Sequence, residues 1–103
     1  SQKVLSHIRK NIYKTVDIDS LAAISCLSKD HFIRLFKKEV GTTPLQYINQ
    51  KKIEKAQLIL ITEDIPVKNI AYLLAYEDHS YFNRLFKKIT DVTPQQYREL
   101  YKK

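Results

Sequence analysis

Two segments of this chain gather side chains that can hydrogen-bond to base edges. The first carries Lys29, Asp30, Ile33 and Arg34, and the second carries His79, Ser80, Asn83 and Arg84. Residues three and four apart share one face of a helix. Arginine can bond twice to guanine, asparagine can bond twice to adenine, and isoleucine can pack on a thymine methyl group. The spacing therefore predicts two surfaces that read bases in the major groove of DNA; an ordinary solvated helix face is the alternative.

Lysines lie about one helical turn beyond both segments. The pairs are Lys37 and Lys38, then Lys87 and Lys88, and we place Lys52 in the same group. Lysine contacts to phosphate supply affinity and register without choosing a sequence. The pairs also suit a plain helix end, because the carboxyl end of a helix favours positive charge. The two roles are compatible.

The overall charge agrees with a polyanionic partner. The chain has 103 residues and 18 Lys and Arg against 11 Asp and Glu, which gives a net charge of +7. Nucleic acid and an anionic membrane surface are the two partner classes that such a charge predicts. We expect no membrane partner, because the basic residues alternate with a core stripe instead of flanking an exposed apolar face. The start has no signal-peptide pattern, and no apolar run is long enough to span a bilayer.

An internal repeat organises the chain. Phe32-Ile-Arg-Leu-Phe-Lys-Lys38 returns as Phe82-Asn-Arg-Leu-Phe-Lys-Lys88, and Thr43-Pro44 returns as Thr93-Pro94, always 50 positions later. Over the 16 positions 32–47, ten residues are identical at this offset. The two base-reading segments occupy equivalent places in the repeat, so the sequence predicts two copies of one structural unit.

Each copy has the signals of a short helix, a tight turn and a second helix. The apolar spacing predicts helices over 2–13, 18–25, 29–39, 43–61, 66–75 and 79–89, and a last helix from Pro94. Side-chain oxygens of Asp17, Ser28, Thr43 and Asp78 can cap the helices that follow them. Gly41 can end a helix in the left-handed conformation, and Asp91 takes its place in the second copy.

These elements predict an all-α fold with about seven helices, in which each copy forms a helix-turn-helix. Phe32, Leu35 and Phe36 fall on one helix face and should form a core, as should Phe82, Leu85 and Phe86. Neither half alone is large enough to fold strongly.

No enzyme site emerges from the sequence. Cys26 is the one cysteine, follows an apolar stretch and has no basic cluster beside it, so we interpret it as a small core residue. His7, His31 and His79 are scattered and lack metal-ligand spacing, and the acidic pairs lie near helix starts, where capping explains them. We predict no catalytic residue, no metal and no cofactor. A single cysteine is also typical of a reducing, cytoplasmic setting.

The second copy closely resembles the signature of the AraC/XylS family of bacterial transcription regulators. The residues concerned are Ile70-Ala71, Ala75-Tyr76, Asp78, Tyr81-Phe82, Arg84, Phe86-Lys87-Lys88, Thr93-Pro94 and Tyr97-Arg98. The first copy resembles the family's first unit through Leu21-Ala22, Leu27-Ser28, Phe32, Arg34, Phe36-Lys37-Lys38, Gly41, Pro44 and Tyr47-Ile48. The match runs from about residue 4 to 101.

The resemblance implies a homeodomain-like fold with a first helix-turn-helix subdomain over 1–42, a linker helix over 43–61 and a second subdomain over 62–103. It also implies that the second helices of the two subdomains enter successive major grooves of double-stranded DNA. Carried over by position, it implies the same base-reading residues named above. The chain departs from the family pattern at Ala75-Tyr76, usually Gly-Phe, at Lys52, usually Arg, and at Asp91, usually Gly. Asp30 is a less usual acidic residue on such a face. It could select a cytosine amino group or form a salt bridge with Arg34.

The resemblance also bears on the rest of the protein. The absence of methionine predicts that this chain is a fragment of a longer protein, and the family usually carries an effector-sensing domain on the amino-terminal side. The second function considered is a protein-interaction module that recruits RNA polymerase, with DNA binding secondary. Target sequence and direction of regulation stay open.

Overall fold

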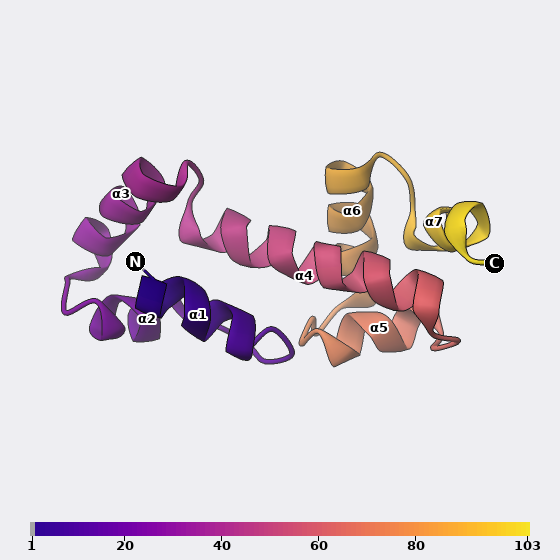
Figure 1. Ribbon diagram of the computed structural model, residues 1–103, viewed down its shortest axis with the longest axis horizontal. Helices are drawn as coiled ribbons and strands as arrows, with labels where there is room; N and C mark the ends of the chain where they lie inside the picture. Colours follow the sequence, from indigo (N-terminus) through magenta and orange to yellow (C-terminus); the bar gives the residue numbers. More distant parts are fainter. Residues whose placement is uncertain (1) are drawn as a thin grey trace. The chain divides into compact units, whose positions relative to one another are not determined.

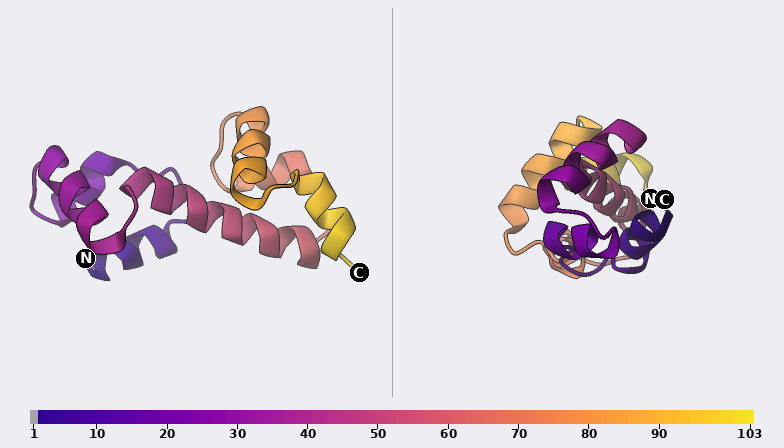
Figure 2. Two further views of the ribbon diagram at one scale, coloured as in Figure 1. Left: turned by 90° about the horizontal axis from the view of Figure 1, so that it is seen from above. Right: turned by 90° about the vertical axis from the view of Figure 1, so that its left-hand side faces the viewer.

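The computed structural model describes residues 2–103 and contains seven helices, with no strand in that range (Figure 1). This confirms the predicted all-α class. The helices are α1 (Gln2–Lys10), α2 (Ile18–Ile24), α3 (Lys29–Val40), α4 (Pro44–Thr62), α5 (Val67–Leu73), α6 (His79–Thr90) and α7 (Pro94–Tyr101). In the left view of Figure 2, α4 runs as one continuous helix.

The chain divides into two compact units within α4. Unit 1 comprises residues 1–51 and unit 2 comprises residues 52–103. The long helix is thus shared between the units, and the three-part division with a separate linker stays a prediction. Unit 1 contains the helix pair α2–α3, and unit 2 contains the pair α5–α6.

Each unit has its own apolar core around two phenylalanines. In unit 1, Phe32 and Phe36 pack with buried side chains of α1, α2 and α4: Val4, Ile8, Leu21, Ala22 and Ile48. In unit 2, Phe82 and Phe86 pack with buried side chains of α4 and α5: Ile53, Ala56, Ile59, Leu60, Ile70, Ala71 and Leu74. The predicted aromatic stripes are confirmed as core, although Leu35 and Leu85 are only half-buried.

The same ring geometry occurs in both cores. Phe36 lies edge-on to Tyr47 with ring centroids 5.7 Å apart, and Phe86 lies edge-on to Tyr97 at 5.6 Å. Edge-to-face pairs at this separation are favourable beyond the area that they bury. The rings therefore fix the inner side of α3 and of α6 in one position and leave the opposite side outward.

The predicted caps are confirmed. Asp17 accepts from the backbone N–H of Asp19 at 2.7 Å, and these local hydrogen bonds hold the pKa of its carboxyl below the usual value. Ser28 accepts from the N–H of His31 at 3.3 Å, and Asp78 accepts from that of Ser80 at 2.8 Å. The caps of Ser28 and Asp78 set the first turns of α3 and α6, where the base-reading candidates begin.

The helix ends at positions 41 and 91 also match the prediction. Gly41 has φ +97° and Asp91 has φ +71°, so both residues are left-handed and end α3 and α6 in the same way. The first helix is shorter than predicted, because it ends at Lys10 instead of residue 13. Asn11 stops it by donating its side-chain amide to the His7 carbonyl at 2.8 Å.

The prediction for Cys26 is wrong. Cys26 is exposed and adopts a left-handed conformation with φ +58° in the turn between α2 and α3. The chain must reverse direction there, and this backbone geometry turns the side chain outward while Leu27 packs against the core. Ala75, with φ +67°, occupies the corresponding place between α5 and α6.

Candidate nucleic-acid interface

The α3 face comprises Lys29, Asp30, Ile33 and Arg34. Lys29, Asp30 and Arg34 are exposed, whereas Ile33 is half-buried and packs partly against the core of unit 1. Arg34 Nε donates to the backbone carbonyl of Asp30 at 3.4 Å, a long bond to the main chain and not to the carboxylate. The arginine fork and the acidic side chain thus both remain on the solvent side of the helix.

The α6 face comprises His79, Ser80, Asn83 and Arg84, at the corresponding positions. Ser80 and Arg84 are exposed, and His79 and Asn83 are half-buried. The His79 ring lies edge-on to Tyr72 of α5 with centroids 6.4 Å apart. Asn83 Oδ1 is buried and accepts no hydrogen bond from any residue in 2–103. The structure brings all four predicted residues onto one side of α6, but His79 and Asn83 are less exposed than Ser80 and Arg84.

The lysine pairs lie on the surface at the carboxyl ends of α3 and α6. Lys37, Lys38, Lys87 and Lys88 are all exposed, in the last turns of α3 and α6. Their charges therefore border the two faces on the solvent side of each unit.

Lys52 does not fit the phosphate contact predicted for it. Its side chain is only 4% exposed, and its Nζ donates to the backbone carbonyl of Leu74 at 2.6 Å. The ammonium also lies over the Tyr76 ring, 5.9 Å from the centroid. Burial lowers the pKa of Lys52 to about 8, because the protein interior disfavours its charged form. Its place is in the interior of unit 2, out of reach of DNA.

A spacing signal for this burial was present in the sequence. Ile48 and Ala56 are both buried, and Lys52 lies four residues from each, so all three share one helical stripe. A lysine within an apolar stripe indicates a buried partner for its ammonium, which here is the backbone carbonyl of Leu74 at the carboxyl end of α5.

Arg98 and Lys102 form a second polar contact that sequence reasoning missed. Arg98 donates through Nε to the Leu60 carbonyl at 3.0 Å and through a terminal nitrogen to the Glu63 carbonyl at 3.1 Å. Lys102 Nζ donates to the Glu63 carbonyl at 2.8 Å and pairs with the Asp64 carboxylate at 2.8 Å, which lowers the pKa of Asp64. These cations satisfy carbonyl groups at the carboxyl end of α4 and tie α7 to it.

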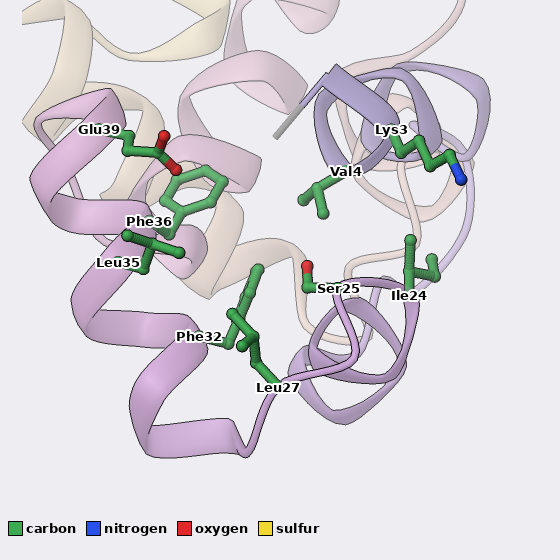
Figure 3. Close-up of a pocket in the computed structure, with 9 residues that line it drawn as sticks. All are labelled: Lys3, Val4, Ile24, Ser25, Leu27, Phe32, Leu35, Phe36 and Glu39. Atoms are coloured by element: carbon green, nitrogen blue, oxygen red, sulfur yellow. The ribbon is translucent and has the colours of Figure 1, made fainter.

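An apolar groove in unit 1 lies away from the α3 face. Its volume is about 220 Å³, and Figure 3 shows Leu35 and Phe36 of α3 on one side and Val4 and Ile24 on the other. Phe32, Leu35 and Phe36 project from the core side of α3, opposite the base-reading candidates. The rim carries one base and one acid, Lys3 and Glu39.

Metal-binding and membrane-spanning features were also considered among the residues that the structure describes. Within residues 2–103, no three side chains of His, Cys, Asp or Glu come together in a group that could hold a metal ion. No helix in the described chain combines the length and apolarity needed to cross a membrane.

Comparison with known proteins identifies the family. The model of the helix-turn-helix domain matches residues 21–100. The chain is 34% identical over 94 residues to the MmsAB operon regulatory protein of Pseudomonas aeruginosa, covering 91% of this chain and 31% of that protein. It is 33% identical over 82 residues to the arabinose operon regulatory protein of Escherichia coli, covering 80% of this chain and 28% of that protein.

A solved structure agrees along almost the whole chain. The carboxy-terminal domain of the two-component response regulator yesN from Fusobacterium nucleatum superimposes with a TM-score of 0.89 at 32% identity, covering 94% of this chain and 95% of that one. The chain spans about a third of the length of the curated relatives, 31% and 28% in the two cases above. The chain therefore belongs to the AraC/XylS family of transcription regulators, as a helix-turn-helix DNA-binding domain.

Proposed function

We propose that the chain binds a specific site on double-stranded DNA by placing α3 and α6 in two successive major grooves. The carrying observation is that two helix-turn-helix units each bury one side of their second helix and leave a basic, hydrogen-bonding side outward. On α3 the base-reading residues are Lys29, Asp30, Ile33 and Arg34, and on α6 they are His79, Ser80, Asn83 and Arg84. Lys37, Lys38, Lys87 and Lys88 contact phosphates.

The two faces should make unlike contacts. Arg34 and Arg84 occupy the same place and suit guanine, while Ile33 suits a thymine methyl group where Asn83 suits adenine. Because Asn83 Oδ1 is buried in the free protein, reading adenine requires its amide to rotate outward. One chain with two unlike faces should read one asymmetric site, since a palindrome matches a two-fold axis between two chains.

The direct test compares Arg34→Ala and Arg84→Ala on single-base variants of a DNA site selected from random duplexes. Each variant should lose discrimination at its own base, by roughly 10- to 100-fold for a lost bidentate contact. Lys68→Met, which removes an exposed charge from α5, is the control and should leave both preferences intact. Equal weakening on every sequence would mean that the two arginines contact phosphates, and the assignment would fail.

Salt dependence separates this function from its alternative. If the lysine pairs neutralise phosphates, the logarithm of the binding constant should fall with the logarithm of salt concentration, with a slope steeper than about −4. A module that chiefly recruits RNA polymerase, with DNA binding secondary, would show a nearly flat titration. A flat result at low and moderate salt would count against the DNA-reading proposal.

The remaining proposals concern the whole protein. We infer that an effector-sensing part lies elsewhere in the full-length chain, because the curated relatives extend well beyond the matched region. We also infer a cytoplasmic place of action, where bacterial DNA is found, and a role without catalysis. Contact with RNA polymerase would then occur outside the two DNA-reading faces.

A further inference from the structure

The turn between α5 and α6 is held by a buried ammonium group. Leu74 follows the last residue of α5, and its carbonyl accepts from Lys52 Nζ at 2.6 Å. The next residue, Ala75, takes the left-handed conformation that redirects the chain. Tyr76, under the same ammonium, packs on Phe82 of α6 with ring centroids 5.5 Å apart. One cation thus contacts the end of α5 and the residue that leads into α6.

Unit 1 builds the corresponding turn without a cation. Ser25 occupies the place of Leu74, and its hydroxyl donates to the Leu21 carbonyl at 3.1 Å within the same helix. Cys26, at φ +58°, corresponds to Ala75. The backbone hydrogen bonds match as well: Cys26 and Leu27 donate to Ala23 and Ala22 at 3.0 and 3.1 Å. The same turn therefore exists in two forms within residues 2–103: a lysine from another helix bonds the form in unit 2, and a serine bonds within its own helix in unit 1.

We propose that Lys52 is a positioning residue: its ammonium holds the α5–α6 turn and thereby fixes the direction in which α6 presents His79, Ser80, Asn83 and Arg84. The inference rests on the proposed DNA-reading function. Charge-assisted hydrogen bonds are roughly twice as strong as neutral ones, so an ammonium restrains a carbonyl more tightly than an amine does. Leu74 is fully buried, and its carbonyl therefore needs a donor.

Among the ionisable groups near the α5–α6 turn, Lys52 is the one expected to change its charge in mildly alkaline solution. Tyr76 lies beneath its ammonium, and the ring of Tyr81 of α6 is tilted against the Tyr76 ring, with centroids 6.0 Å apart. Burial and the neighbouring Tyr81 raise the pKa of Tyr76, so this phenol stays neutral in mildly alkaline solution. Along α4, the neighbouring ionisable residues are Lys51, Glu54 and Lys55. With its pKa at about 8, Lys52 loses its proton between about pH 7 and pH 9.5.

The first experiment uses the free protein and therefore does not depend on DNA. Hydrogen exchange of the Ala75 and Tyr76 amides, which donate to Tyr72 and Ala71 at 2.9 and 3.0 Å, reports on the turn. In Lys52→Met these amides should exchange about tenfold faster while those of Cys26 and Leu27 keep their rates. Lys52→Arg should restore the parental rates, because arginine also donates and stays charged. Unchanged rates at Ala75 and Tyr76 in the folded Met variant would overturn the proposal.

The second experiment measures base discrimination by each face below the melting temperature of every variant. In Lys52→Met, the base preference that depends on Arg84 should fall several-fold, and the base preference that depends on Arg34 should stay unchanged. In the parent, raising the pH from about 7 to about 9.5 should weaken the Arg84-dependent preference, and in Lys52→Arg it should not, since arginine stays protonated. If Lys52 were purely structural, its replacement would change stability alone, and the Arg84-dependent base preference of the parent would not vary with pH. That result would overturn the proposal. Failure of DNA reading itself would appear separately, as no base-dependent effect of Arg84→Ala in the parent.

Discussion

The two helix-turn-helix units share their aromatic core but differ in how their helix ends are closed. In unit 1, uncharged side chains from the same or the next turn do this: Asn11 bonds the His7 carbonyl and Ser25 bonds the Leu21 carbonyl. In unit 2, the Thr90 hydroxyl likewise bonds the Phe86 carbonyl near the end of α6, but charged side chains from distant positions bond the ends of the other two helices. These are Lys52 at the end of α5, and Arg98 and Lys102 at the end of α4.

This difference distinguishes the aromatic core, which is the same in both units, from the hydrogen-bond donors at the helix ends, which differ. The paired phenylalanines and the edge-on tyrosine set the direction of the second helix in both units, and their spacing is identical. The closures act on backbone carbonyls, which any donor can satisfy. A charged donor makes a stronger bond and also costs desolvation when buried. Unit 2 should therefore respond to alkaline pH through the buried ammonium of Lys52.

The largest expected effect tests what the units share. Phe36→Ala and Phe86→Ala should each cost about 3–5 kcal/mol, because each ring is buried in the core of its unit and its removal leaves a cavity there. Each loss should unfold its own unit, since a unit of about 50 residues has little stability to spare. Residue-resolved hydrogen exchange would locate the unfolding. A variant that melts like the parent would show that the ring is not part of the core.

The next effect distinguishes the units by pH. Lys52 has a pKa of about 8 in the folded protein and an ordinary value of 10.5 when unfolded. Between these values the unfolded chain binds more protons, so the free energy of unfolding should rise with pH and level off above 10.5. The full gain is at most about 3 kcal/mol at 1.36 kcal/mol per pKa unit.

Lys52→Met is the control for that titration. Other lysines and tyrosines also titrate at high pH, so the measured quantity is the difference in unfolding free energy between the parent and the variant across the range. That difference should change with pH, with the parent gaining relative to the variant above about pH 8. A constant difference would mean that the ammonium is not desolvated in the folded state.

A smaller effect tests the second charged closure. Arg98→Met should destabilise unit 2 by about 1.5–3 kcal/mol, the range for hydrogen bonds to a charged group, because the Leu60 carbonyl loses its donor and the Glu63 carbonyl keeps only that of Lys102. Arg98→Lys keeps the charge without the two-pronged guanidinium, so the stability of its unit 2 should lie between those of the parent and Arg98→Met. Ile48→Val in unit 1, which trims an apolar contact, is a matched reference and should leave unit 2 unchanged. Equal melting of the parent and Arg98→Met would exclude a role for the fork.

Much of the fold could be predicted from the sequence because its signals are local. Caps such as Ser28 and Asp78 act within one turn, and the left-handed ends at Gly41 and Asp91 need only the residue type and its place. The length of the first helix could not be predicted as well, because Asn11 satisfies a carbonyl that the apolar pattern does not reveal.

The site could be predicted less completely, since it depends on contacts between distant residues. Periodicity places Arg34 and Arg84 outward, and the structure agrees. The same periodicity was ambiguous for Lys52, whose partner carbonyl lies 22 positions away, and for Cys26, whose side chain is turned outward by its backbone. Charge alone suggested phosphate contact for Lys52, and long-range packing made that assignment wrong.

The smallest effect concerns the ends of α3 and α6, where the units differ by one residue type. A side chain added at Gly41 would meet nothing within 4 Å, so Gly41→Ala should cost only the backbone strain of φ +97°, about 1 kcal/mol. Asp91 already carries that strain at φ +71°, with its acidic side chain at the negative end of α6. Asp91→Gly should therefore stabilise unit 2 by up to about 0.5 kcal/mol, less than the strain removed, because glycine also gains freedom in the unfolded chain. Asp91→Asn removes the charge and keeps the side chain, so it separates the two contributions. Chemical denaturation of the three variants would measure them, and a loss of stability in Asp91→Gly would show that the carboxylate makes a compensating contact at the end of α6.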